Sequence, residues 1–270
     1  MLDLHLHSTH SGDGLSTIAE YADRARRAGL AVIGFCEHAD FDPRDQGGGY
    51  PHPARYRREL AATAERVPAV RLCRGVEVTY QAGFEDEIRT WLSGHAWDYV
   101  VASVHLIDYA DGWAIVSEPQ AIADYFAAHS RREAYRPYFE ELLRAARSGL
   151  GHILGHFDLI KRYGVTCYGP FEPAAFQDEI RAVLRAAVAS GLGLEINTSG
   201  LRQAPGEPYP GLDVLRWYRE LGGEIITAGS DAHQAGDLGA GIPTGLDLAR
   251  AAGFRAVAYF IQGRPHWLDL

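Results

Sequence analysis

Short apolar runs recur along the chain, and most of them end at a polar residue. Several of these runs, such as 31–35 and 99–102, are apolar without alternation. Strands that are buried on both faces have this pattern, as in a parallel sheet flanked by helices. The predicted strands are Leu2–His7, Ala31–Cys36, Val70–Val78, Tyr99–Val104, Ile153–His156, Gly193–Asn197, Glu224–Ala228 and Ala256–Phe260.

Segments with helical periodicity lie between these strands. The first begins with Thr17 and Glu20, which have capping-box spacing, and ends at Gly29, a residue suited to a helix C-terminus. The others are Arg55–Arg66, Phe84–Trp91, Asp124–Ser148, Pro173–Ser190, Leu212–Leu221 and Leu246–Ala252. Strands that alternate with helices along the whole chain predict an α/β fold with a parallel sheet or barrel. No long linker divides residues 1–270, so we expect a single domain, with surface loops at 47–51 and 202–211.

Length and composition narrow the class of protein. The chain has 270 residues, which is close to the ~250 residues typical of (β/α) barrels. Its net charge is −9 and it has no run of Lys or Arg, so we expect no nucleic-acid partner. Three cysteines without a Cys-x-x-Cys pair, and no signal-peptide pattern, predict a cytoplasmic location. No apolar run reaches the roughly 18 residues of a membrane span, so we expect no membrane partner.

Side chains that can bind metals cluster at the ends of the predicted strands. His5 and His7 end the first strand two residues apart, so extended backbone points both to the same face. The other candidates end later strands or lie in the loops after them: Asp13, His38, Glu77, His105, His156, Asp231 and His233. Because the carboxyl ends of barrel strands converge on one face, we expect all of these side chains to lie close together.

The number of candidate ligands predicts more than one metal ion. Nine donors exceed the four ligands of a typical zinc site, so we predict two or three divalent ions, Zn, Mn or Fe, that share carboxylates. Glu77 is the expected bridge, because a carboxylate has two oxygens. Such a cluster would polarise a phosphoryl group and activate water, which predicts a small phosphorylated substrate. Asp13, taken alone, is equally compatible with a turn or a helix N-cap.

The motifs at the strand ends resemble those of the PHP (polymerase and histidinol phosphatase) superfamily, and within it those of the monofunctional histidinol phosphatases. The superfamily motifs are Asp3–Ser8, Glu37–His38, Gly75–Glu77, Ser103–His105, Gly155–His156 and Gly229–His233. The motifs closer to the phosphatase branch are Glu77–Tyr80, Phe84–Ile88, Ser103–Asp108, His156–Lys161 and Glu195–Arg202. The resemblance implies a distorted (β/α)7 TIM-like barrel, so one of the eight predicted strands is either a wrong prediction or lies outside the barrel, and the last, Ala256–Phe260, is the first candidate.

The resemblance also implies an arrangement of ligands and a reaction. The implied first metal is bound by His5, His7, Glu77 and Asp231, the second by Glu77, His105 and His156, and the third by Asp13, His38 and His233. The family often has His where Asp13 stands, and either residue can be a ligand. The implied reaction is hydrolysis of L-histidinol phosphate in histidine biosynthesis, with Asp231 or His233 assisting proton transfer to the leaving alkoxide.

Two arginines are candidates for binding the substrate phosphate. Arg162 and Arg202 follow the fifth and sixth predicted strands, and a guanidinium matches phosphate oxygens. Each of them is also compatible with a solvated surface position, and Lys161 competes with Arg162 for the role. Glu195 and Asn197 are expected to line the pocket or to orient ligands.

Other functions remain open from the sequence. One is a PHP nuclease, or a phosphatase that acts on nucleotides or another small monoester. A second is an amidohydrolase-type barrel, which also opens with His-x-His, although the Asp13, His38 and His233 set argues against it. A third is a metal-binding protein without catalysis.

Overall fold

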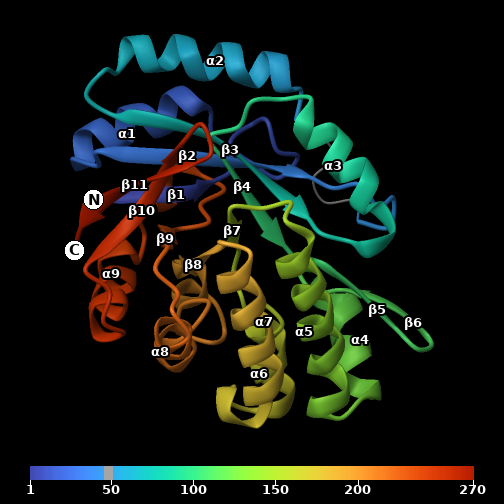
Figure 1. Cartoon of the computed structure of the whole chain (residues 1–270). Helices are drawn as coiled ribbons and strands as arrows, with labels where there is room; N and C mark the ends of the chain where they lie inside the picture. The colour runs from blue at the N-terminus through green and yellow to red at the C-terminus, as the bar shows by residue number, and fades with distance from the viewer. Residues whose placement is uncertain (46–50) are drawn as a thin grey trace.

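Seven parallel strands form a nearly closed barrel in the computed structural model, which describes residues 1–45 and 51–270 (Figure 1). A parallel bridge between Leu6 and Ala232 joins the end of the first strand to the segment after the last. In their order around the sheet, the strands are β1 (Leu2–Leu6), β2 (Val32–Ala39), β3 (Arg71–Thr79), β4 (Tyr99–Ser103), β7 (Ile153–Leu154), β8 (Gly193–Asn197) and β9 (Ile226–Gly229). This confirms the TIM-like α/β barrel. Positions 47–50 of the predicted glycine-rich loop lie outside the described residues.

Helices surround the barrel (Figure 1). They are α1 (Ile18–Ala28), α2 (Pro53–Arg66), α3 (Glu85–Ser93), α4 (Pro119–Ala128), α5 (Arg131–Ser148), α6 (Lys161–Tyr168), α7 (Gln177–Ala189), α8 (Leu212–Glu220) and α9 (Ile242–Ala251). Single 3-10 turns are η1 (Ala82–Phe84), η2 (Pro173–Phe176), η3 (Thr198–Arg202) and η4 (Ala235–Asp237). Among the described residues, no helix combines the length and apolar character needed to cross a bilayer.

The ends of α1 follow the sequence prediction. Thr17 accepts a hydrogen bond from the backbone N–H of Glu20, and the carboxylate of Glu20 accepts one from the N–H of Thr17. Gly29 ends the helix with φ 72°, a left-handed conformation that favours glycine. By contrast, the prediction of one helix over Asp124–Ser148 was wrong. The chain breaks between α4 and α5, because Ser130 and Glu133 form a second capping box that starts a new helix.

The last predicted strand lies outside the barrel, as expected from the family barrel of seven. It is β10 (Ala256–Ile261), which pairs antiparallel with β11 (Arg264–Asp269). A second hairpin, β5 (Leu106–Tyr109) and β6 (Gly112–Ile115), was missed because its strands are short and one face is exposed. Helix α6 was also missed, since it has only eight residues.

The amino end of the barrel is closed by aromatic packing around Tyr99, the first residue of β4. Its hydroxyl donates to the carbonyl of Leu4 at 2.7 Å. Gly34 and Gly75 make room for this ring, because a Cβ at these positions would lie 2.2 Å from Oη and 2.4 Å from Cζ of Tyr99, respectively. Phe260 of β10 stacks on Tyr99 with ring centroids 6.3 Å apart, so the C-terminal hairpin covers this end.

Candidate metal centre

All nine predicted ligands gather at the carboxyl end of the barrel strands. They come from β1, β2 and β3 and from the loops that follow β1, β4, β7 and β9. Five of these polar side chains are buried, four imidazoles and one carboxylate: His5, His7, Glu77, His105 and His156. Burying such groups without partners is unfavourable, so their grouping calls for a chemical reason.

Glu77 lies at the centre of the cluster. Its Oε2 is 3.2 Å from Nε2 of His5 and 3.5 Å from Nε2 of His7. Its Oε1 is 2.8 Å from Nε2 of His156 and 3.5 Å from Nε2 of His105. Nδ1 of His38 also lies 3.3 Å from Oε2. Each carboxylate oxygen therefore faces a different set of imidazoles, which is the placement that a bridging ligand needs.

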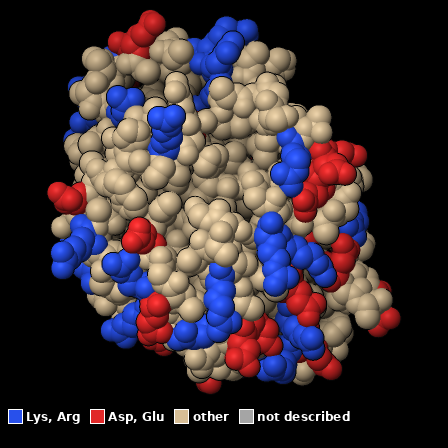
Figure 2. All heavy atoms as spheres, in the orientation of Figure 1, with Lys and Arg blue, Asp and Glu red and all other residues tan. Residues whose placement is uncertain are grey.

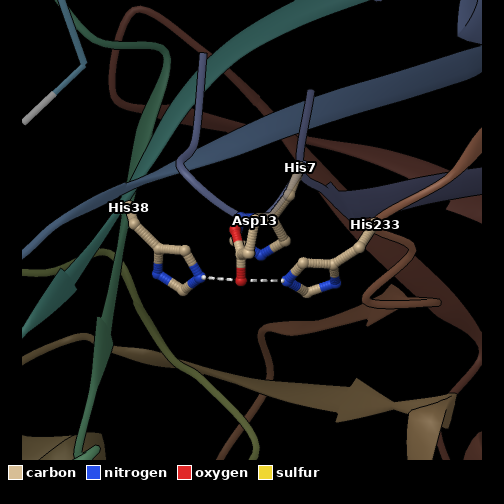
Figure 3. Close-up of side chains that lie close together, drawn as sticks. All are labelled: His7, Asp13, His38 and His233. Atoms are coloured by element: carbon tan, nitrogen blue, oxygen red, sulfur yellow. Dashed lines mark ion pairs between the residues drawn. The ribbon is translucent and has the colours of Figure 1, made fainter. Parts of the chain in front are cut away.

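A further group forms around Asp13 (Figure 3). Its Oδ2 is 2.9 Å from Nε2 of His233 and 3.5 Å from Nε2 of His38. The ring of His7 stacks against both histidines, with centroids 4.3 Å apart in each case. Asp13 does not cap α1, because Thr17 does so. The turn from β1 to α1 instead directs the Asp13 carboxylate toward the two imidazoles.

Asp231 completes the set from the loop after β9. Its Oδ1 is 3.5 Å from Nε2 of His7 and 3.9 Å from Nε2 of His5. Its backbone has φ 55°, an uncommon conformation for a residue other than glycine. Asn197 donates to the other carboxylate oxygen at 3.2 Å, so β8 helps to orient this side chain.

The donor atoms fit divalent metals. In the described part of the chain, Nε2 of His5, Nε2 of His7 and Nδ1 of His38 are buried without a hydrogen-bond partner. Nε2 of His105 and Nε2 of His156 are 3.1 Å apart, and their lone pairs repel unless a proton or a cation lies between them. The donors fall within 4.8 Å of one another in overlapping groups: His5, His7 and Glu77; Glu77, His105 and His156; His7, Asp13, His38 and His233; and His38, Asp40 and His105. Such mixed N/O sets suit zinc, manganese and iron.

At several positions, the surroundings keep the side chain in the protonation state that can bind a metal. Burial lowers the pKa of His7 to about 3 and that of His105 to about 3, so both imidazoles are neutral near pH 7. Burial opposes ionisation of Glu77, but the neighbouring imidazoles, His5 first and His156 through its hydrogen bond, outweigh it and hold the Glu77 pKa well below its usual value. For His38, burial is outweighed by the hydrogen bond to Asp13, which raises the pKa to about 10. A metal ion would have to displace that proton.

A cavity of about 330 Å³ opens onto the cluster. Besides predicted residues, it is lined by side chains that the sequence analysis missed: Asp40, Asp45, Ser117, Glu118 and Leu159. Asp40 had a usable signal, since it follows His38 by two residues near the end of β2. Glu118 had none, because it precedes α4 after the missed hairpin and reaches the cavity only through the fold.

A larger cavity of about 840 Å³ lies between α2 and α3, toward the amino ends of β3 and β4. Its lining includes apolar residues such as Leu60 and Trp97 and none of the nine predicted ligands. In the orientation of Figures 1 and 2, the surface between these helices is mostly uncharged. The smaller cavity is therefore the candidate site, because it holds the reactive side chains.

Comparison with known proteins places the chain in a family. Residues 3–199 match the family model of the PHP domain. The chain belongs to the PHP family. A probable histidinol-phosphatase of Deinococcus radiodurans is 32% identical, over 96% of both chains. The histidinol-phosphatase of Lactococcus lactis is 27% identical, over 96% of this chain and 94% of that protein.

Solved structures agree with the family assignment. The histidinol phosphate phosphatase of Lactococcus lactis, crystallised with Zn, L-histidinol and phosphate, has a TM-score of 0.86 and 26% identity over 98% of both chains. A second solved structure, from Listeria monocytogenes, shares the fold, with a TM-score of 0.81 and 20% identity over 90% of this chain and 99% of that one. PHP membership sets aside the amidohydrolase alternative.

The three candidate phosphate-binding cations of this PHP protein lie in different surroundings. Arg162 lines the cavity, and its Nε donates to Gln203 at 2.9 Å. Arg202 donates from Nη2 to the carbonyl of Ser230 at 2.8 Å, beside Asp231, and is not among the cavity-lining residues. Lys161 is fully buried and binds Asp158 at 2.9 Å, so it is a structural residue and does not compete with Arg162.

Proposed function

We propose that this PHP protein is a phosphomonoesterase that hydrolyses L-histidinol phosphate to L-histidinol and phosphate in histidine biosynthesis. The observation that carries the proposal is the position of Glu77 among five histidines at the carboxyl end of the barrel. The names of the Deinococcus and Lactococcus relatives support the substrate, as do the ligands in the Lactococcus structure. Three free cysteines support a cytoplasmic location.

We assign the ligands to two or three ions of Zn, Mn or Fe. The first set is His5, His7, Glu77 and Asp231; the second is Glu77, His105 and His156; the third is Asp13, His38 and His233. Divalent ions bound there would polarise phosphoryl oxygens and lower the pKa of water to about 7.

The remaining roles fall to side chains at or beside the cavity. Arg162 is the one Lys or Arg among the described lining residues, and its guanidinium, held at Nε by Gln203, would bind the substrate phosphate. Arg202 would support the same phosphate from beside Asp231. The proton for the leaving alkoxide would come from Asp231 or His233, which both line the cavity. Glu118 adds a carboxylate that suits the cationic ammonium group of histidinol.

Phosphate release from a panel of monoesters tests the proposal. The metal-loaded protein is assayed with L-histidinol phosphate, p-nitrophenyl phosphate and nucleoside monophosphates, while bound metals are quantified. Recognition of the substrate's polar groups predicts a kcat/KM for histidinol phosphate at least about 100-fold above the others. Equal values would reject the substrate while keeping the phosphatase class. A preference for a nucleotide would favour the alternative nucleotide phosphatase, and no turnover of any ester would reject both.

A further inference from the structure

Strand β3 and the carboxyl end of β4, with the residues just after it, each supply one candidate ligand and one hydroxyl that contacts the ligand supplied by the other. Glu77 and Thr79 lie two residues apart on β3, and Thr79 pairs in register with Ser103 of β4. Ser103 donates its hydroxyl to Oε1 of Glu77 at 2.6 Å. In return, Oγ1 of Thr79 lies 2.8 Å from Nδ1 of His105, just after β4. The arrangement is reciprocal, because both strands present alternate residues to the same face.

The hydrogen-bond chain continues from Thr79 to Asp40. Oγ1 of Thr79 donates to Oδ1 of Asp40 at 2.6 Å, and both side chains are buried. A hydroxyl has a single proton, which it can donate to only one acceptor. Since the proton of Thr79 goes to Asp40, its oxygen accepts the proton on Nδ1 of His105. Nε2 of His105 is then left with its lone pair, and this atom faces Nε2 of His156 at 3.1 Å.

The other imidazoles of the cluster differ in what their Nδ1 atoms contact. Nδ1 of His5 contacts a carboxylate directly, Oε1 of Glu195 at 2.6 Å. Nδ1 of His7 is 3.3 Å from the Ser11 hydroxyl. By contrast, Nδ1 of His156 has no hydrogen-bond partner among the described residues. Of the two imidazoles that face Oε1 of Glu77, His105 is therefore the one that a polar contact at Nδ1 orients.

We propose that Thr79 and Asp40 are positioning residues that hold His105 in the tautomer and ring orientation needed to bind metal. They would thereby set the metal affinity of the group formed by Glu77, His105 and His156. The inference rests on the proposed metal site but not on the proposed substrate. Partners of a metal-binding histidine typically change metal affinity or activity by about 10–100-fold when they are removed.

The role of Thr79 and Asp40 can be tested without any substrate, by measuring zinc binding to the metal-free protein. Thr79→Val keeps the shape of the side chain but removes the acceptor for the buried Nδ1–H of His105. Zinc titration against a chromophoric chelator should show one class of site weakened by about 10–100-fold, and the other sites unchanged. Thr79→Ser, which keeps the hydroxyl, should restore the wild-type affinity. Asp40→Ala should weaken the same site, and adding it to Thr79→Val should cost little more, because both act through one chain of hydrogen bonds.

A matched control is Thr63→Val, which removes a buried hydroxyl on α2, away from the cluster. It should leave all zinc affinities at the wild-type value. Wild-type affinities in Thr79→Val would overturn the proposal, as would a Thr79→Ser variant as weak as Thr79→Val. If Thr79→Val does not fold, Thr79→Ser and Asp40→Ala decide: the proposal requires the first to be normal and the second to be weakened. A result of the monoester panel that rejects histidinol phosphate as substrate would not change these zinc affinities. The proposed substrate and the proposed role of Thr79 and Asp40 can therefore be rejected independently.

Discussion

The two ends of the barrel are built on the same strands and have opposite chemistry. At the amino end, Tyr99 and Phe260 stack, and Gly34 and Gly75 make room for the ring of Tyr99. At the carboxyl end, the strands bury histidines and carboxylates. Several of the histidine nitrogens have no hydrogen-bond partner in the described part of the chain. One end is thus stabilised by packing, while the other carries groups whose burial is unfavourable by itself.

The packed end of the barrel fixes the geometry of the end that carries the candidate ligands. Close packing at the amino end leaves the strands little freedom, so their carboxyl ends present side chains in a fixed arrangement. That arrangement brings lone-pair-bearing nitrogens together, as with Nε2 of His105 and Nε2 of His156. We therefore expect substitutions at the carboxyl end to change metal binding and turnover, and those at the amino end to change stability.

The largest effect is expected at the centre of the ligand cluster. Glu77→Gln replaces a carboxylate that faces histidines with both of its oxygens by an amide that has only one coordinating oxygen. Bound metal should fall and turnover should drop by more than the ~100-fold seen when only a supporting residue is lost. Metal content per chain and phosphate release measure this. The control is Glu220→Gln on α8, and a Glu77→Gln variant that keeps both metal and turnover would remove Glu77 from the site.

A smaller effect, on stability alone, is expected at the amino end. A Cβ at Gly75 would lie 2.4 Å from Cζ of Tyr99 and 2.7 Å from the carbonyl oxygen of Phe35. Overpacking of this kind lowers the free energy of unfolding by about 1–3 kcal/mol, which denaturant melts of Gly75→Ala would measure. Zinc affinity should stay unchanged. Gly83→Ala is the control, because nothing lies within 4 Å of its Cβ position. Lost zinc affinity with normal stability would contradict the division between the two ends.

The smallest effect is a pH dependence of stability at the amino end. Burial lowers the pKa of His152 below its usual 6.5, and its Nδ1 accepts the N–H of Val100 at 3.0 Å. Between the two pKa values the unfolded chain binds more protons than the folded one. Stability from this group is therefore complete above pH 6.5 and is lost as the pH falls through the lowered pKa.

His152→Asn keeps an acceptor for Val100 and removes the titration. In chelator, its unfolding free energy should fall less than that of wild type between pH 7 and pH 5, by up to about 1 kcal/mol, the value of one hydrogen bond. His266→Asn, at an exposed histidine of β11, should follow wild type. Identical pH profiles for His152→Asn and wild type would show that acid acts only at the ligand cluster.

The barrel could be predicted because its signals are local. Apolar runs without alternation identified β4 to within one residue at its end and β2 to within one residue at its start, although β2 continues three residues past its predicted end. The polar residues that end the strands identified the candidate ligands. The hairpin β5–β6 and α6 could not be predicted in this way, since short, half-exposed elements are stabilised mainly by what they pack against. The break between α4 and α5 depends on a second capping box inside one continuous helical pattern.

The order of apolar and polar residues along the chain is enough to find the strand ends, and from them the α/β class and the convergence of His5, His7 and Glu77 on one face. How side chains from different loops meet depends on the folded chain. It turned Asp13 toward His38 and His233, buried Lys161 while Arg162 lines the cavity, and placed Thr79 between Asp40 and His105. The two kinds of information differ in their distance along the sequence. Strand periodicity is a property of neighbouring residues, whereas a hydrogen bond between adjacent strands depends on their register and on the turns that connect them.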